Sequence, residues 1–374
     1  MKILVGDILK SKAQTLINTV NCVGIMGKGI ALEFKKRFPE MFEDYVKKCS
    51  GREVTPGAPY LYRKLFPPQI VNFPTKDHWQ SISRIRDIER GLEHLVSHYR
   101  EWGITSVAIP PLGCGNGQLE WREVGPLIYR YARQMDIPVE MYAPHGTSSR
   151  ELTADFLAQG TSAGTPRIRK ATQRAMNPAW VALVEILHRI EEQPYHRPVG
   201  RIIFQKIAYT ATREGLPTGF VYRVGSFGPF CKELKNAETR LVNNNLLQEE
   251  RQGNMFVVKA GPNFARVRNA FDSSFSLWAP IIEKTADLFM RTNTNQAEIV
   301  ATVMYAADSL KRKEKSRPTE TQVLESVLQW KQKRRPAIDK SMVASTIRNL
   351  GMLRWLDVDP DPDLPVSEDE SLPA

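Results

Sequence analysis

The sequence is poor in cysteine and histidine, with 4 cysteines and 6 histidines among 374 residues. No two cysteines form a CxxC pair, and no paired histidines complete the pattern of a zinc ligand set. Structural zinc sites need such clusters, so we expect no metal and a compartment that keeps thiols reduced. The cysteines are Cys22, Cys49, Cys114 and Cys231.

The sequence also lacks long apolar runs. No run approaches the roughly 20 residues that a membrane-spanning helix needs. The N-terminal segment MKILVGDILKS has no extended apolar stretch of the kind found in signal peptides. We therefore expect a cytoplasmic protein with no membrane partner.

Acidic residues are scarce outside the C-terminal tail. The net charge is +11, yet residues 357–374 carry seven acidic residues and no basic one, which leaves about +18 on the rest of the chain. A basic body of this kind suits a polyanionic ligand or nucleic acid. Charge alone is equally compatible with a merely soluble basic protein.

A chain of this length is too long to fold around one hydrophobic core, so we expect more than one domain. Residues 1–146 alternate short β-branched runs with helical patterns, which predicts an α/β domain with a mostly parallel or mixed sheet between helices. The expected strands are KILVG, TLINTV, IVNFP, SVAIPPL and VEMYAP. The expected helices are residues 27–38, 82–99 and 120–135.

The later residues are organised differently. Residues 147–177 are rich in Gly, Ser and Thr and predict a linker, with room for one short helix. Residues 178–356 predict a mostly helical domain whose first helix is capped by Asn177. Its helices and a hairpin turning at RQGN follow the order of a winged-helix module. The acidic residues 357–374 are expected as a disordered tail.

Two glycine-bearing loops follow predicted strands. In NCVGIMGKG, glycines let backbone N–H groups approach an anion at a helix start, although two glycines also fit an ordinary turn. In PPLGCGNGQLEW, Gly113, Gly115 and Gly117 make an open loop whose N–H groups can cradle phosphate. Its third glycine is misplaced for a GxGxxG fingerprint. Together with Asp7 after the first strand, these loops predict a nucleotide cleft.

The segment NFPTKDHW places Lys76 on a loop that leaves a strand, where α/β proteins keep their chemistry. Taken alone, this residue could be a solvated lysine, a phosphate clamp or a nucleophile. Its position between two glycine loops favours a functional lysine. The neighbouring Asp77 and His78 fit exposed polar residues better than a proton relay, and His94 and His98 lack the glutamate of a zinc motif.

The segments GDIL, INTVNCVGIMGKGIA and PPLGCGNGQLEW resemble the macrodomain family, a three-layer α/β/α module that binds ADP-ribose. With NFPTK included, this set of segments is similar to the branch that contains the terminal ADP-ribose protein glycohydrolases. In combination with residues 178–356, the chain most closely resembles the DarG family of antitoxins. Members of that family remove the ADP-ribose that DarT-like toxins place, using NAD, on thymidine bases of single-stranded DNA. The macrodomain likeness covers about residues 1–144, and the later likeness rests on weaker motifs.

The resemblance implies a role for each matching position. Asp7 and Ile8 would hold the adenine, and Asn21 would orient the distal ribose. Lys76 would be catalytic together with Asn21, and no cofactor is implied. Backbone donors of the two glycine loops would wrap the diphosphate. The ADP-ribose-binding positions are Asp7, Ile8, Asn21, Gly27, Lys28, Gly29, Ile30, Thr75, Gly113, Cys114, Gly115, Asn116 and Gly117.

Two routes remain open for Lys76. A neutral amine can attack the distal ribose carbon or its opened aldehyde. A charged ammonium can instead stabilise or protonate the departing base. The glycohydrolase branch carries an aspartate in the second glycine loop where this sequence has Gly117, so the same lysine–aspartate dyad is not available. This departure favours DNA over protein-linked ADP-ribose as the substrate.

We therefore expect an antitoxin with two activities. Residues 1–146 would release ADP-ribose from single-stranded DNA, and residues 178–356 would bind and block a DarT-like toxin. The alternative is a non-catalytic ADP-ribose reader fused to a winged-helix DNA-binding regulator. Its candidate recognition helix has mixed charge, whereas a face that tracks phosphates is usually more one-sided. These charges are Lys232, Glu233, Lys235, Glu238 and Arg240.

Overall fold

The computed structural model describes residues 1–159, 176–253 and 255–366. The chain divides into two compact units, Met1–Ala175 and Met176–Ala374. None of the helices in the described ranges combines the length and apolar character that crossing a bilayer demands.

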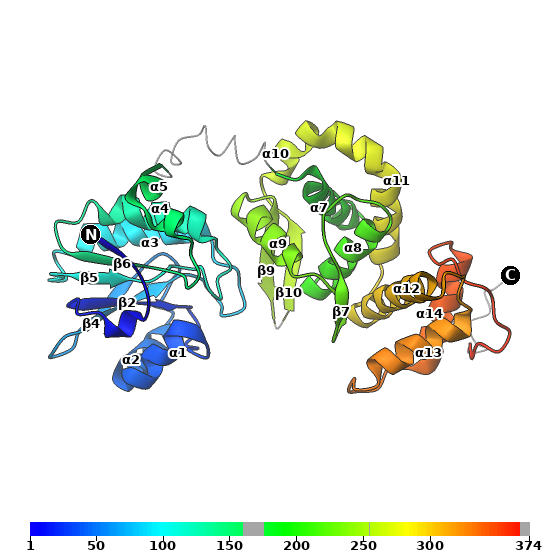
Figure 1. Cartoon of the computed structure of the whole chain (residues 1–374), viewed down its shortest axis with the longest axis horizontal. Coiled ribbons are helices and arrows are strands. Elements are labelled where there is room, and N and C mark those ends of the chain that lie inside the picture. The colour runs from blue at the N-terminus through cyan, green and yellow to red at the C-terminus, as the bar shows by residue number, and fades with distance from the viewer. Residues whose placement is uncertain (160–175, 254, 367–374) are drawn as a thin grey trace. The chain divides into compact units, whose positions relative to one another are not determined.

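The first unit contains a six-stranded mixed sheet (Figure 1). The strand order is β1-β6-β5-β2-β4-β3, and all neighbours are parallel except β3, which runs antiparallel to β4. The five strands expected from the sequence are present, whereas β3 was not predicted. The strands are β1 (Lys2–Val5), β2 (Thr15–Val20), β3 (Tyr60–Tyr62), β4 (Gln69–Pro74), β5 (Val107–Ile109) and β6 (Val139–Ala143).

Helices cover both faces of this sheet, because successive strand residues point to opposite sides. On β2, Leu16 packs into one core with Phe34 of α1, while Ile17 packs into the other with Ile88 of α3. The expected α/β architecture is confirmed, with α2 as an unpredicted addition. The helices are α1 (Gly29–Arg37), α2 (Pro39–Ser50), α3 (Ile85–His98), α4 (Trp121–Ala132) and α5 (Ala154–Gln159), with the 3-10 turns η1 (Ile8–Lys10) and η2 (Ser149–Leu152).

The start of the segment expected as a linker belongs to the first unit. Leu157 of α5 is fully buried in the core beside α4. The carbonyl of Glu151 accepts a 3.3 Å hydrogen bond from the Trp121 indole. A linker beginning at residue 147 is therefore wrong for residues 149–159, because their apolar side chains find a place on α4. Residues 160–175 of the expected linker lie outside the described residues.

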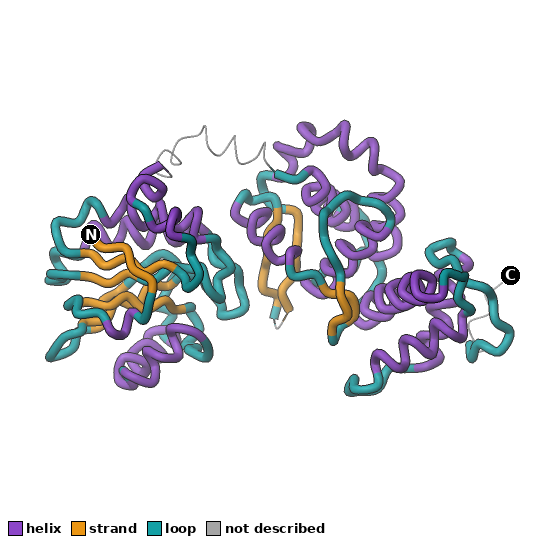
Figure 2. Tube along the Cα trace, viewed as in Figure 1, coloured by secondary structure: helices purple, strands orange, loops and turns teal. Residues whose placement is uncertain are grey.

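The second unit is largely helical, as expected (Figure 2). Asn177 caps its first helix by accepting a 2.9 Å hydrogen bond from Ala179 N, as predicted. Its helices are α7 (Pro178–Glu191), α8 (Arg201–Arg213), α9 (Glu233–Asn243), α10 (Phe264–Arg268), α11 (Asp272–Phe289), α12 (Thr294–Glu314), α13 (Glu320–Lys331) and α14 (Lys340–Met352), with the 3-10 turn η4 (Asn269–Phe271).

Two antiparallel hairpins complete this unit. The predicted hairpin around RQGN is formed by β9 (Leu247–Gln252) and β10 (Met255–Ala260), and Gly200 adds a single antiparallel bridge to Val257. A second hairpin, β7 (Arg223–Gly225) and β8 (Gly228–Phe230), was not predicted from the sequence.

The expectation of a disordered acidic tail from Asp357 is wrong for residues 357–366. Asp357 forms ion pairs with Lys311 and Arg317. Asp359 N donates a 2.9 Å hydrogen bond to the carbonyl of Pro318, and Leu364 is buried. The basic end of α12 therefore attracts these acidic residues and holds them against the helices. Residues 367–374 of the expected tail lie outside the described residues.

Candidate functional site

The predicted site residues share one edge of the sheet. Asp7 follows β1, Asn21 follows β2, Lys76 follows β4, and Gly113 lies shortly after β5. These strands belong to the parallel part of the sheet, so their carboxyl ends lie on the same side. Ligands of open α/β folds bind at this edge.

Asn21 organises the first glycine loop. Its side chain is 5% exposed, and its Oδ1 accepts hydrogen bonds from Val23 N at 2.9 Å and from the Tyr45 hydroxyl at 3.0 Å. Its Nδ2 donates to the carbonyl of Ile25 at 2.5 Å. These contacts fix the path of the loop towards Gly29, which begins α1 with a φ of +61°. Asn21 therefore shapes the loop from within.

The backbone N–H groups at the start of α1 receive no cap from Lys28. That residue occupies the N-cap position in an extended conformation, and its side chain makes no capping hydrogen bond. Gly27, Lys28 and Gly29 are exposed, and Ile30 is half-buried. Uncapped N–H groups at a helix N-terminus can attract an anion, and anion binding by this loop stays a prediction.

Lys76 is buried where the loops meet. It is 8% exposed, and its Nζ donates hydrogen bonds to the carbonyls of Asn116 at 2.8 Å and Trp79 at 3.0 Å. The preceding Thr75 is also buried, and its N–H donates to the carbonyl of Val20 at 3.0 Å. The amine is thus held between its own loop and the second glycine loop. A solvated surface lysine does not describe this side chain.

The second glycine loop packs closely against both neighbours. A Cβ added to Gly29 would lie 3.2 Å from Asn116 Nδ2, so the two glycine loops are adjacent. Gly113 adopts a φ of +74°, a left-handed conformation that favours glycine. Ser83 N donates a 3.0 Å hydrogen bond to the carbonyl of Gly117, and a Cβ at 117 would lie 2.2 Å from Ser83 Oγ. Gly117 is therefore required by packing.

Cys114 has the properties of a packing residue. Burial, followed by the charge of Glu123, raises the pKa of its thiol to about 12. Burial similarly raises the pKa of the Cys22 thiol to about 12. A thiol must ionise to act as a nucleophile, so neither cysteine has that character near neutral pH.

The residues expected at the adenine show different exposure. Asp7 is exposed, and its carboxylate caps η1 by accepting a 3.0 Å hydrogen bond from Leu9 N. Ile8 is 4% exposed and contributes its side chain to the core beneath α1 and α2. The backbone of Ile8 and the carboxylate of Asp7 lie at the same sheet edge as the loops.

Sequence reasoning missed several residues that support the site. Tyr45 lies on the unpredicted helix α2, and its buried hydroxyl reaches both the carbonyl and the side chain of Asn21. Ser83 N, which donates to the carbonyl of Gly117, brings the loop after Lys76 into contact with the second glycine loop. No local pattern marks these contacts, because they join segments far apart in the chain.

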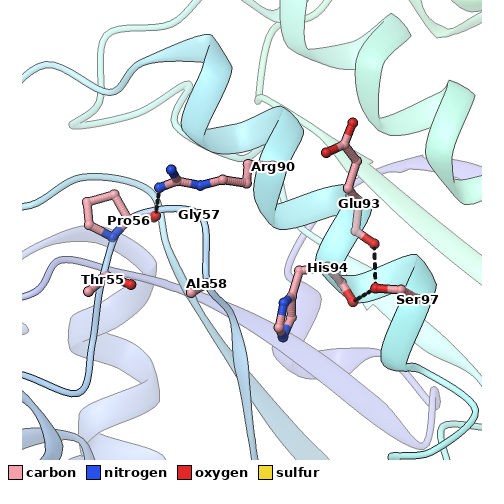
Figure 3. A pocket seen from close by; sticks show the side chains of 8 residues that line it. All are labelled: Thr55, Pro56, Gly57, Ala58, Arg90, Glu93, His94 and Ser97. Carbon is pink, nitrogen blue, oxygen red and sulfur yellow. Dashed lines mark hydrogen bonds between the residues drawn. The ribbon is translucent and has the colours of Figure 1, made fainter.

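A pocket of about 700 Å³ lies elsewhere on the first unit (Figure 3). It lies between loop residues 55–58 and one face of α3, and Arg90 donates a hydrogen bond across it to the carbonyl of Pro56. The pocket shares no residue with the predicted ADP-ribose positions. It is therefore not the predicted site.

His94, which lines that pocket, stacks on His98 with ring centroids 4.0 Å apart. Burial, followed by the charge of His98, lowers the pKa of His94. Within the described ranges, no group of three or more His, Cys, Asp or Glu residues is placed to hold a metal ion.

Comparisons with known proteins agree with the geometry of the first unit. A macro domain family model matches residues 17–128. A DNA ADP-ribosyl glycohydrolase of Mycobacterium tuberculosis is 36% identical over 242 residues, which is 62% of this chain and 64% of that relative. A DNA ADP-ribosyl transferase–glycohydrolase fusion protein of Thermosipho africanus is 40% identical over 162 residues, covering 38% of this chain and 42% of the fusion.

Among solved structures, the macrodomain of Mycobacterium tuberculosis DarG is 46% identical and matches 38% of this chain and 97% of its own, with a TM-score of 0.37. The chain spans less than two thirds of the length of the curated relatives named above. The expected resemblance is confirmed: residues 17–128 match the macro domain family, and the chain is similar to DNA ADP-ribosyl glycohydrolases of the DarG type.

Proposed function

We propose that residues 1–146 form a DNA ADP-ribosyl glycohydrolase that removes ADP-ribose from thymidine bases of single-stranded DNA. The observation that carries the proposal is the buried Lys76 amine, held between two glycine loops at the carboxyl edge of the sheet. The activity named for the Mycobacterium tuberculosis relative supports the choice of substrate. We place this activity in the cytoplasm.

In this proposal the bound ADP-ribose lies along the sheet edge. Asp7 and the backbone of Ile8 hold the adenine. Asn21 orients the distal ribose. The diphosphate is wrapped by backbone donors of both glycine loops and by Thr75. The positions contributed by the two loops are Gly27, Lys28, Gly29, Ile30, Gly113, Cys114, Gly115, Asn116 and Gly117.

The reaction exchanges one bond for another at the distal ribose. The bond between its anomeric carbon and the thymine nitrogen breaks, and the electron pair leaves with the base. Water supplies hydroxide to the carbon and a proton to the base, so thymidine and ADP-ribose are the products. Lys76 serves either by attacking the carbon as a neutral amine or by donating to the departing base as an ammonium.

Both routes use the observed placement of Lys76. A neutral amine has two N–H bonds, so it can donate to both Asn116 and Trp79. An ammonium can donate to the same two carbonyls. The two carbonyls therefore act as an orienting clamp whichever form reacts.

The test offers three substrates side by side: single-stranded DNA with ADP-ribosylated thymidine, an ADP-ribosylated protein, and free ADP-ribose derivatives. We expect release from DNA, with Lys76→Ala inactive and Lys36→Ala, an exposed lysine on α1, fully active. ADP-ribose binding without release from any substrate would identify a reader instead. Release from protein alone would overturn the choice of DNA.

We also propose that residues 178–356 bind and inhibit a DarT-like ADP-ribosyltransferase toxin. The fusion relative, whose name joins a transferase to a glycohydrolase, supports this pairing. We assign a winged-helix-like core to this domain, supported by the order of α7, α8, α9 and the β9–β10 hairpin, with the bridge from Gly200 to Val257.

Toxin inhibition is tested separately from hydrolysis. The full chain carrying Lys76→Ala should still co-purify with the toxin and suppress its modification of DNA at equal molar ratio. This variant cannot reverse the modification, so suppression would report binding alone. Unimpeded modification at excess antitoxin would overturn the inhibitory role.

A further inference from the structure

Trp79 presents an aromatic surface beside the buried lysine. Trp79 is 43% exposed, whereas Lys76 is 8% exposed. The Trp79 carbonyl accepts the 3.0 Å hydrogen bond from Lys76 Nζ, so the indole belongs to the residue that contacts the amine. An exposed tryptophan whose backbone contacts a buried amine offers a large flat face to a part of the ligand that stays in solvent.

The loop that carries Trp79 is held in place by local contacts. Ser81 N donates a 3.0 Å hydrogen bond to the carbonyl of His78, and His78 N donates to the Asp77 carboxylate at 2.7 Å. The His78 and Trp79 ring centroids lie 5.5 Å apart. These contacts fix the turn before any ligand arrives, and a fixed aromatic ring loses little freedom when a flat partner stacks on it.

Positive charge follows Trp79 along the chain. Arg84 and Arg86 are both exposed at the start of α3, five and seven positions after the indole. Nearby negative charge comes from the exposed Asp77 and from the half-buried Asp87, whose pKa is raised chiefly by burial. Aromatic rings with adjacent cations are the usual surface for single-stranded nucleic acid, whose bases stack while its phosphates meet arginine.

We infer that Trp79 is a stacking platform for a base that flanks the modified thymidine, with Arg84 and Arg86 beside the adjoining phosphates. The inference rests on the proposed function and names how that site holds a strand. The modified thymine must reach the buried Lys76, so the base that meets the exposed indole belongs to a neighbouring nucleotide. The platform thus selects modified thymidine within single-stranded DNA over modified thymidine alone.

The experiment compares an ADP-ribosylated oligonucleotide of about ten nucleotides with ADP-ribosyl-thymidine nucleoside. Losing one stacked base should lower kcat/KM of Trp79→Ala on the oligonucleotide about tenfold, mainly through KM. The loss of Trp79→Ala on the nucleoside should be about fivefold smaller than on the oligonucleotide, because no flanking base is present. Trp79→Phe should retain most activity, and Phe66→Ala, which removes a 72% exposed aromatic elsewhere on the unit, should match wild type.

Two results would contradict the proposal that Trp79 stacks on a flanking base. Equal losses on both substrates would mean that the indole only positions Lys76, and no loss on either would mean that it contacts no base. Binding of the unmodified oligonucleotide, followed by fluorescence anisotropy, gives a readout without turnover. If wild type releases no ADP-ribose, the proposed function fails. If Trp79→Ala binds the strand as tightly as wild type, the stacking inference fails.

Discussion

Lys76 Nζ donates a 2.8 Å hydrogen bond to the backbone carbonyl of Asn116, 40 positions further along the chain. Because the acceptor is a main-chain oxygen, the position of the amine depends on the path of the second glycine loop. The side chain of Asn116 instead lies beside Gly29 of the first loop. A change that moves either loop therefore moves the amine, which makes the three loops one functional unit.

Replacing Lys76 by methionine should lower the rate of ADP-ribose release from DNA by about 100-fold or more, because no donor or nucleophile remains at that position. Affinity for ADP-ribose should fall much less, since the glycine loops supply the proposed diphosphate contacts. Single-turnover release and calorimetric titration measure the two quantities. A variant with more than about a tenth of wild-type release would exclude a catalytic Lys76.

The two catalytic routes can be separated by Lys76→Arg and a reductive trap. An amine that attacks the opened aldehyde forms an imine, and cyanoborohydride reduces it to a stable adduct on wild type but not on Lys76→Arg. Mass spectrometry detects that adduct at Lys76. No adduct, together with substantial release by Lys76→Arg, would instead identify charge as the contribution of this residue.

Gly117→Asp should not create a protein-directed enzyme. A Cβ at 117 would lie 2.2 Å from Ser83 Oγ and 2.5 Å from the Gly113 carbonyl, so the loop must shift to accept it. We expect a loss of stability of about 1–3 kcal/mol and weaker release from DNA. Thermal unfolding measures the first, with Gly115→Ala as the stability control because a Cβ there meets nothing within 4 Å. Unchanged stability and new release from protein would contradict this reasoning.

Local sequence patterns predicted five of the six sheet strands and both glycine loops because each depends on neighbouring residues. The apolar alternation of β2 and the glycines after β5 are such signals. The clamp on Lys76 could not be predicted, since its acceptors are backbone carbonyls in two loops. Pairing of Asp357 with α12 likewise needed the three-dimensional structure.

In the second unit, Lys331→Met should destabilise the region around α12 and α13 by about 3 kcal/mol. Lys331 Nζ lies 2.7 Å from Glu298 and donates to the carbonyl of Ser226 at 2.9 Å, in an almost completely buried position. In the variant, Glu298 keeps the ion pair with Arg334, at 3.4 Å. Hydrogen exchange in α12 and α13 at increasing urea measures the loss.

A double variant tests whether the effect comes from an uncompensated charge. Lys331→Met with Glu298→Met removes both charges, and it should recover much of the stability that Lys331→Met loses. The nearby Lys206 amine, whose pKa burial lowers to about 8, still donates to the carbonyl of Pro229. Additive losses from the two substitutions would show that the ion pair is not the cause.

Glu238→Gln should remove a pH dependence from the stability of the second unit. Burial, followed by the nearby charge of Glu249, raises the pKa of Glu238 from 4.5 to about 8, although Arg201 and Lys235 oppose this. Between these values the folded state retains a proton that the unfolded state releases. The folded state therefore loses stability as the pH rises from about 5 to 8, by at most about 1.4 kcal/mol per pH unit.

Glutamine resembles the protonated glutamate and does not titrate. The difference in free energy of unfolding between Glu238→Gln and wild type should therefore grow in favour of the variant as the pH rises through this range. It should level off above pH 8. Hydrogen exchange of α9 at pH 5, 6.5 and 8, corrected for intrinsic exchange rates, measures the difference. Glu233→Gln is the matched control, because it removes an exposed carboxylate from the same helix. A constant difference between Glu238→Gln and wild type would mean that Glu238 ionises in the folded protein at its ordinary pKa.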